Sequence, residues 1–225
     1  MGQRNSSGSG PGTITPDGCA VELYTRLPAR GEPELVHAAV PAGAGIVEFG
    51  CGTGRISTPL ARLGHRVVGV DESPEMLALC REIETVRSSI EEAELGERFD
   101  AVLLASHLVN SPGEQRTGFL EAARRHLAPG GTVVVQRFRP GWVDTVADAD
   151  HDDGTLRSTL TVLDRPGPRR LHARIRYAIG DSVWEQEFTT CELDDAALPE
   201  ALAAAGLRFG RLLTEDGEWF TATAA

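Results

Sequence analysis

The sequence predicts an α/β fold: a mostly parallel sheet of seven strands with helices on both faces, and an antiparallel β meander inserted after the fifth strand. Between residues 47 and 137, short apolar segments alternate with amphipathic ones, the pattern of a parallel sheet that is covered on both faces. Between Trp142 and Glu192 the helical period disappears, and apolar and polar residues alternate instead. That alternation indicates antiparallel strands.

The individual elements follow from their apolar pattern and from the residues at their ends. Ser73 is a suitable N-cap and Pro74 a suitable first residue for one helix, and Gly64 ends the helix before it. The strands of the main sheet are expected at 47–49, 67–70, 86–90, 101–105, 132–137, 207–213 and 218–222. The helices are expected at 19–27, 33–40, 56–63, 74–83, 118–127 and 195–205.

The meander is expected to contain about three strands. Leu171, Ala173 and Ile175 fall on one face of such a strand and arginines on the other, with turns at 165–168 and 180–181. Residues 1–16 are rich in Gly, Ser and Pro and are expected to form a disordered tail. The domain prediction is therefore a core of 17–140 with 193–225, and an antiparallel insertion of 141–192 that covers the substrate.

Composition limits the classes of function. The net charge of −11 argues against a nucleic-acid partner, because phosphate binding needs a basic surface. No apolar run reaches the roughly 20 residues of a membrane span. The four cysteines are scattered without zinc-site spacing, which favours reduced thiols in a cytoplasmic protein.

The segment from Ile46 to Asp71 is the most informative part of the chain. A short apolar run ends in Gly50, Gly52 and Gly54, and the next apolar run ends in the acid Asp71. Such a strand, glycine loop, helix and acidic strand end form a unit suited to hold a nucleoside. Dinucleotide enzymes use Gly-x-Gly-x-x-Gly, whereas here Arg55 follows a tighter glycine spacing. The spacing suits a ligand without a pyrophosphate.

Four motifs resemble those of class I S-adenosylmethionine-dependent methyltransferases that act on small molecules, in particular the sugar-amine and glycine N-methyltransferase-like members. The motifs are Val-Glu-Phe-Gly-Cys-Gly-Thr-Gly at 47–54, Val-Asp-Glu-Ser-Pro-Glu-Met-Leu at 70–77, Phe-Asp-Ala-Val at 99–102 and Leu-Ala-Pro-Gly-Gly at 127–131. The resemblance implies a Rossmann-like fold and a monomer or homodimer. It also implies methyl transfer from S-adenosyl-L-methionine to an N or O atom of a small, specialised metabolite, with S-adenosyl-L-homocysteine as the product.

The resemblance also implies a cofactor site. Asp71 would accept hydrogen bonds from the ribose hydroxyls, and Glu48 would lie near the cofactor's ammonium group or act as a structural anchor. Tyr24 would close over the cofactor or serve in packing, and Met76 would contact adenine or belong to the core. Ser89 stands where the family often has an acid that contacts adenine, so side-chain recognition there is in doubt. The expected cofactor residues are Tyr24, Glu48, Gly50, Cys51, Gly52, Gly54, Asp71, Glu72, Ser73, Met76, Ser89, Ile90, Ala105 and Ser106.

His107 is the candidate catalytic residue, because it follows a strand end near the expected methyl group and titrates near neutral pH. Its alternative role is a structural histidine. The sequence Leu-Val-Asn-Ser-Pro after His107 lacks the Asn-Pro-Pro-Tyr of members that methylate amides and adenine, which favours a free small molecule. The expected acceptor-binding residues are Arg137, Arg139, Trp142 and Tyr177. No metal is expected, and the acidic run 148–153 is interpreted as a solvated loop.

Two other functions stay open at this stage. The first is a nicotinamide-dependent dehydrogenase, which the glycine spacing disfavours. The second is a non-catalytic nucleoside-binding or partner protein of the same fold. The acceptor itself has no readable signature, so sugar amines, amino acids and phenols all stay possible.

Overall fold

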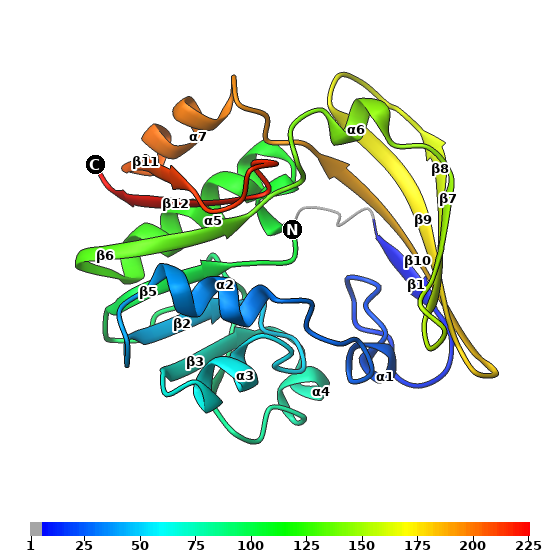
Figure 1. The fold of residues 1–225 in the computed structure, drawn as a ribbon, viewed down its shortest axis with the longest axis horizontal. Helices are drawn as coiled ribbons and strands as arrows, with labels where there is room; N and C mark the ends of the chain where they lie inside the picture. The colour runs from blue at the N-terminus through cyan, green and yellow to red at the C-terminus, as the bar shows by residue number, and fades with distance from the viewer. Residues whose placement is uncertain (1–5) are drawn as a thin grey trace. The chain divides into compact units, whose positions relative to one another are not determined.

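The computed structural model describes residues 6–225, which divide into two compact units (Figure 1). One unit comprises residues 28–140 and 193–225. The other comprises the N-terminal segment up to Leu27 together with residues 141–192.

The larger unit is built on a seven-stranded sheet in the order β11-β12-β6-β5-β2-β3-β4. Its strands are β2 (Gly45–Phe49), β3 (Arg66–Asp71), β4 (Glu84–Arg87), β5 (Phe99–Leu104), β6 (Leu127–Gln136), β11 (Leu207–Leu212) and β12 (Trp219–Ala224). Strand β12 pairs antiparallel with both of its neighbours, and the five strands from β6 to β4 are parallel. The predicted seven-stranded, mostly parallel sheet is confirmed.

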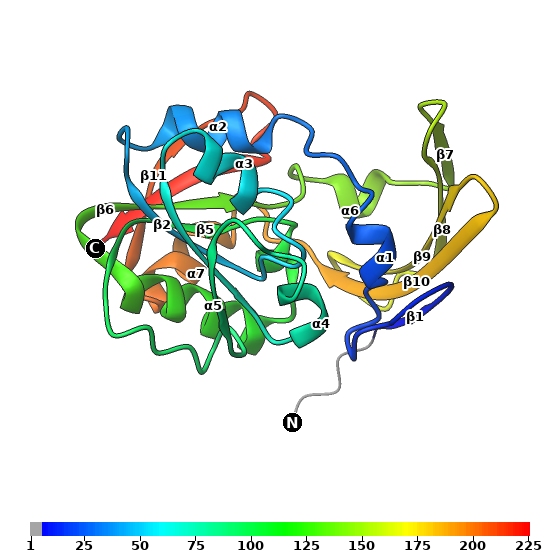
Figure 2. The same ribbon diagram turned by 90° about the horizontal axis from the view of Figure 1, so that it is seen from below.

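Helices cover both faces of this sheet, as Figure 2 shows. Val47 and Phe49 point toward the face covered by α5 (Gly113–His126) and α7 (Leu198–Ala204), whereas Ile46 points toward α2 (Glu32–Ala39) and α3 (Ser57–Arg62). Successive side chains of a strand point to opposite faces. A strand buried on both faces must therefore be apolar at nearly every position, which is why these segments read as continuous apolar runs.

Helix α4 (Pro74–Leu77) is much shorter than the helix predicted at 74–83. Its start is as expected, because the Ser73 hydroxyl accepts a hydrogen bond from Met76 N at 3.1 Å. Beyond Leu77 the backbone tightens into three-residue turns, and the Cys80 thiol donates to the carbonyl of Gly52 at 3.2 Å. The contact of Cys80 with the glycine loop thus replaces further helical turns.

Other boundaries differ by a few residues. Helix α5 begins at Gly113 rather than 118, and β4 covers Glu84–Arg87 rather than 86–90. Strand β6 includes the Pro-Gly-Gly segment 129–131 that was expected to be a turn before it. A 3₁₀ turn, η1 (Leu108–Asn110), follows β5.

The smaller unit is a five-stranded antiparallel sheet in the order β1-β10-β9-β8-β7. Its strands are β1 (Ser7–Ser9), β7 (Ala149–Asp152), β8 (Arg157–Asp164), β9 (Arg170–Ile179) and β10 (Ser182–Cys191). The unit also contains the short helices α1 (Val21–Tyr24) and α6 (Trp142–Thr145). The predicted alternation is visible in the burial of Leu171 and Ala173, which share one face with the buried Trp184.

Three sequence expectations are corrected in this unit. The predicted tail 1–16 is wrong at Ser7–Ser9, which pairs with β10, while its first five residues lie outside the described part of the chain. Residues 17–27 group with this sheet rather than with the parallel core, because Ala20 and Leu23 pack against Trp184. Residues 149–152 form an edge strand rather than a loop, because they pair with β8 and Asp150 accepts from the Thr159 hydroxyl at 2.6 Å.

Two kinds of feature are absent from the described residues 6–225. Within that range, no group of three His, Cys, Asp or Glu side chains is arranged to hold a metal ion. No helix in the same range has the length and apolar character needed to cross a membrane.

Candidate functional site

The glycine loop leaves β2 at the carboxyl edge of the parallel sheet, where ligands of such sheets bind. The amide groups of Gly50 and Cys51 both donate to the carbonyl of Val70, at 2.8 and 3.0 Å. These bonds fasten the start of the loop to the end of the neighbouring strand β3.

Glycine is required at the three positions of the loop for different structural reasons. All have positive φ angles, +69° at Gly50, +55° at Gly52 and +82° at Gly54, which L side chains rarely adopt. A Cβ atom at Gly50 would lie 3.1 Å from Leu108, and one at Gly54 would lie 2.9 Å from Thr58. A Cβ at Gly52 would meet nothing within 4 Å. The middle of the loop therefore presents open backbone, while its two ends are closely packed.

Asp71 connects this loop to the end of β3. One carboxylate oxygen accepts from the amide of Gly52 at 2.9 Å, and the other accepts from the amide of Ser73 at 2.9 Å. A carboxylate has about four acceptor positions. The side chain can therefore hold the loop and also accept hydrogen bonds from a ligand lying beside the open backbone of Gly52.

Glu48 lies beneath the loop and is only 3% exposed. The Ser57 hydroxyl donates to its carboxylate. Burial raises the pKa of Glu48 to about 7, against the opposing effects of the Ser57 hydrogen bond and the nearby Arg55 charge. The Ser57 contact matches the structural-anchor role considered for Glu48, and proximity to an ammonium group stays a prediction.

The raised pKa of Glu48 predicts a specific pH dependence of stability. The protonated form is favoured by the fold, so this contribution is complete below pH 4.5 and is lost as pH rises through about 7. Glu48→Gln keeps a neutral side chain of the same shape at every pH. Relative to wild type, its unfolding free energy should rise by up to about 3 kcal/mol between about pH 5 and pH 8. Urea unfolding of both proteins measures this difference, and a pH-independent difference would contradict it.

Of the other predicted cofactor residues, Ile90 lies beside the loop. Ile90 is buried, and its side chain lies 3.9 Å from the position of a Cβ at Gly50. Met76 is buried in the core after the Ser73 cap. The hydroxyl of Ser89 donates to Glu92 at 3.2 Å. The carbonyl of Glu72 accepts from Arg87 at 3.3 Å. The cofactor contacts predicted for these four residues, Ile90, Met76, Ser89 and Glu72, stay predictions.

The thiol of Cys51 points inward rather than toward the open side of the loop. Cys51 is buried, and a Cβ at Gly69 would lie 2.7 Å from its sulfur. Only the backbone of Cys51 can therefore contribute to a ligand site. Tyr24 lies in the unit with the antiparallel sheet, where its hydroxyl accepts from the Cys19 thiol at 3.4 Å, and its closing role stays a prediction.

Ala105, Ser106 and His107 follow the end of β5, and the next residue, Leu108, faces Gly50 across the loop. Ser106 and His107 have φ angles of +53° and +60°. Left-handed backbone at residues other than glycine is strained and is frequent at functional sites. The His107 ring stacks on Phe138, with centroids 4.3 Å apart and an interplanar angle of 17°.

Glu218 is a functional candidate that the sequence reasoning missed. Its Oε1 atom lies 3.5 Å from Nε2 of His107 and accepts from the Gln136 side-chain amide at 2.6 Å. Interaction with His107 is the largest influence that holds the pKa of Glu218 below its usual value, with Gln136 acting in the same direction against burial. Gln136 lies 82 positions from Glu218 in the sequence. A polar residue, Gln136, at the end of an apolar strand is the local feature of the sequence that could have indicated this cluster.

Arg137 is not available to a substrate, which corrects the prediction. The side chain is 1% exposed and donates to the carbonyls of Gly217 at 2.9 Å and Leu193 at 3.0 Å, and to Asp195 at 2.6 Å. A buried guanidinium needs such partners, so Arg137 fastens the segments before α7 and before β12. The sequence pattern could not distinguish this role, because every partner is remote along the chain.

The predicted contact with the acceptor stays a prediction for three residues, Arg139, Trp142 and Tyr177. Arg139 is exposed and Trp142 is half-buried. Tyr177 packs against the Trp184 cluster on the antiparallel sheet. Trp142 and Tyr177 both belong to the smaller unit.

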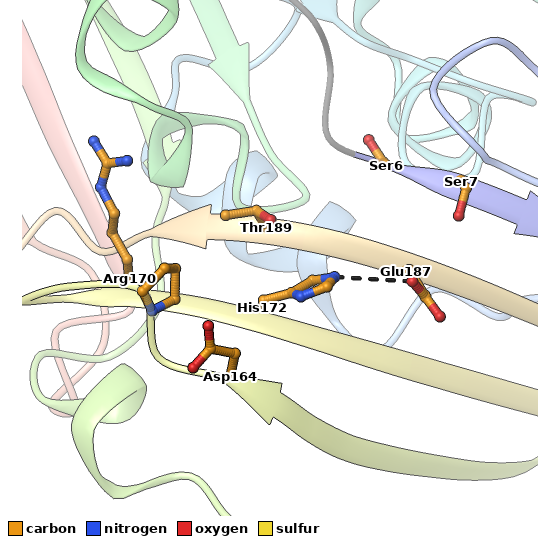
Figure 3. Close-up of a pocket in the computed structure, with 8 residues that line it drawn as sticks. Ser6, Ser7, Asp164, Arg170, His172, Glu187 and Thr189 are labelled. Carbon is orange, nitrogen blue, oxygen red and sulfur yellow. Dashed lines mark ion pairs between the residues drawn. The ribbon is translucent and has the colours of Figure 1, made fainter.

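The antiparallel sheet carries a separate polar hollow of about 530 Å³, lined among others by Asp164, Arg170, His172 and Glu187. Figure 3 shows His172 pointing toward Glu187, with Nε2 and Oε2 3.8 Å apart. Glu187 also accepts from Arg174. None of the residues predicted to contact an acceptor lines this hollow, and its Glu187 carboxylate is already engaged by Arg174.

Comparison with known protein families identifies the central part of the larger unit. Residues 46–131 match the family model described as a methyltransferase domain. The matched range contains the glycine loop, Asp71 and His107.

Two curated relatives match over part of their length. A demethylmenaquinone methyltransferase of Tropheryma whipplei (strain Twist) is 36% identical over 106 residues, which are 44% of each chain. A cypemycin N-terminal methyltransferase of a Streptomyces species is 33% identical over 163 residues, 66% of this chain and 64% of the relative. The chain spans about half the length of the first curated relatives it matches.

Solved structures resemble the chain over almost its whole length. The CcbJ methyltransferase of Streptomyces caelestis superposes with a TM-score of 0.75 at 22% identity, covering 91% of this chain and 96% of that one. The S-adenosylmethionine-bound CalS10, an amino pentose methyltransferase of Micromonospora echinaspora, gives a TM-score of 0.63 at 24% identity, covering 86% and 88%. Residues 46–131 therefore match a methyltransferase domain, and the chain has the fold of class I, Rossmann-like methyltransferases.

Proposed function

We propose that this protein transfers a methyl group from S-adenosyl-L-methionine to an N or O atom of a small molecule. The observation that carries the proposal is the open backbone at Gly52, held by the carboxylate of Asp71 at the carboxyl edge of the sheet. The methyltransferase-domain match over residues 46–131 supports it. So does the likeness in fold to a methyltransferase that was crystallised with S-adenosylmethionine.

The residues present fit this cofactor. The glycine loop offers backbone without side chains where a Cβ would project into open space at Gly52. Asp71 offers a carboxylate to the ribose hydroxyls, and the buried Glu48 offers a carboxyl group to the amino-acid end of the cofactor. When bound, the cofactor supplies an electrophilic methyl group on sulfur, so the protein mainly aligns the reacting groups.

His107 is proposed to accept a proton from the nucleophilic atom of the acceptor. An amine that is protonated in solution, or a hydroxyl, must lose a proton around the time of methyl transfer. Amine acceptors are further supported by the relatives that are named as an N-terminal methyltransferase and an amino pentose methyltransferase. We infer a small-molecule acceptor rather than nucleic acid from the net charge of −11.

The proposal also covers the cellular location and the oligomeric state of the protein. The four cysteines are free thiols in the structure, which supports a reducing, cytoplasmic environment. The protein is proposed to act as a monomer or homodimer, as the resemblance implies, and sedimentation of the purified protein distinguishes the two.

Calorimetric titration with S-adenosylmethionine tests the proposal at the level of binding. A folded sample should bind the donor, and the absence of binding would overturn the proposal. Incubation with a donor that carries a deuterated methyl group, and with a panel of amines and phenols, should then produce mass-shifted products. Binding without any product would favour a non-catalytic protein, and quenching of nicotinamide fluorescence on addition of the protein would favour a dehydrogenase.

A further inference from the structure

We propose that Glu218 is the positioning residue for His107, and that the two side chains together take up the proton released by the acceptor. The inference rests on the proposed function of the same site. It assigns a role to a residue outside residues 46–131, the range that matches the methyltransferase domain.

The side chain of His107 is held on two sides. Phe138 stacks against the ring at 4.3 Å, which fixes the plane of the imidazole. Oε1 of Glu218 lies 3.5 Å from Nε2, which fixes the rotation of the ring within that plane. Only about a third of each side chain is exposed, at 32% for both His107 and Glu218. The pair is therefore partly shielded from solvent. Water and salt screen the interaction between the two side chains less than they would on an exposed surface.

Glu218 is itself held in place. The amide of Gln136 donates to Oε1 of Glu218 at 2.6 Å, and the oxygen of Gln136 accepts from the backbone amide of Ser106 at 2.8 Å. The chain of contacts thus returns to the residue before His107. Such a closed network can hold Ser106 and His107 in the left-handed backbone that they adopt.

A second contact fixes the stacking partner. The side-chain oxygen of Asn110 accepts from the backbone amide of Phe138 at 2.8 Å. The loops after β5 and β6 and the segment before β12 therefore meet around one imidazole. This arrangement is more specific than a histidine that only fills space would need.

Other charged groups lie near the pair. Asp216 acts on Glu218 as a like charge, and Arg139 lowers the pKa of Asp216 as an opposite charge after the stronger effects of its hydrogen bonds.

The proton step follows from the geometry. With Nε2–H directed to Glu218, Nδ1 of His107 is the nitrogen with a free electron pair. The N–H or O–H bond of the acceptor breaks and its proton moves to Nδ1. The nucleophile forms a bond to the methyl carbon as the carbon–sulfur bond breaks, and the electron pair of that bond stays on sulfur. The imidazolium, stabilised by the Glu218 carboxylate, later releases its proton to water.

The test compares Glu218→Gln with Glu215→Gln, which removes the same charge from an exposed position on the same loop. The NMR signals of the His107 ring, assigned with His107→Ala, need no ligand or activity. The ring signals should shift in Glu218→Gln, because the carboxylate beside Nε2 is lost. They should stay unchanged in Glu215→Gln. Unchanged ring signals in Glu218→Gln would overturn the inference.

Turnover adds a second readout. Glu218→Gln should lower kcat at the pH plateau by about tenfold through loss of ring orientation, and it should move the acid limb of the profile to lower pH. Its affinity for S-adenosylmethionine should match that of wild type. Wild-type turnover in Glu218→Gln with an unmoved profile would overturn this inference and leave the proposed function intact. Failure of the wild-type protein to bind the donor would instead overturn the proposed function.

Discussion

Asp71→Ala is expected to raise the dissociation constant for S-adenosylmethionine by about 100-fold, the loss that corresponds to two hydrogen bonds to a charged group. The carboxylate has two tasks at this position. It would accept hydrogen bonds from the ribose, and it already holds the amides of Gly52 and Ser73 at 2.9 Å. Alanine removes both tasks, so the loop loses its anchor as well as its ligand contact. Calorimetric titration of the folded variant measures the change.

A matched control separates ligand contact from general stability. Asp100 also holds a backbone amide, that of Gly45 at 2.9 Å, but it does so near the start of β5, at the opposite edge of the sheet. Asp100→Ala therefore loses a similar contact and should leave the dissociation constant unchanged. Equal weakening in both variants would assign the effect to stability. Unchanged binding in Asp71→Ala would remove Asp71 from the cofactor site.

Gly52→Ala is expected to weaken donor binding by about tenfold or more, because even a single methyl group placed in a close backbone contact forces the ligand away. The new Cβ would meet no protein atom within 4 Å, so the fold itself has room for it. The positive φ of +55° imposes a cost in stability, which should be about 1–2 kcal/mol. The loss of binding, about 1.4 kcal/mol or more for a tenfold change, should therefore come in addition to this cost in stability. Calorimetry and urea unfolding of the same variant measure the two effects.

Gly43→Ala is the control for the backbone cost. Gly43 has a φ of +72°, and a Cβ there would also meet nothing within 4 Å. It lies before β2, at the edge of the sheet opposite the glycine loop. Gly43→Ala should lose a similar amount of stability and bind the donor normally. If the two variants bound the donor equally well, the open backbone at Gly52 would have no role in binding.

Local sequence was sufficient for the parallel core and for half of the site. Apolar runs predict strands buried on both faces, and the spacing of Gly50, Gly52 and Gly54 predicts a loop that offers its backbone to a nucleoside, because each depends on residues that are neighbours in the chain. Asp71 was found for the same reason, since a strand end is a local property. The shortened α4 was missed, because the thiol of Cys80 turns toward Gly52, a contact that no local rule contains.

The sequence by itself determined the order of strands and helices in the larger sheet, the glycine loop and the acid at the end of β3. Tertiary structure alone decided the environment of the second half of the site. It buried Arg137 on Gly217, Leu193 and Asp195, and it brought Glu218 beside His107 through Gln136. Hydrogen bonds between side chains depend on where distant segments meet in space. One chain read alone carries no signal for such a meeting, whereas periodicity and spacing are visible in every short stretch.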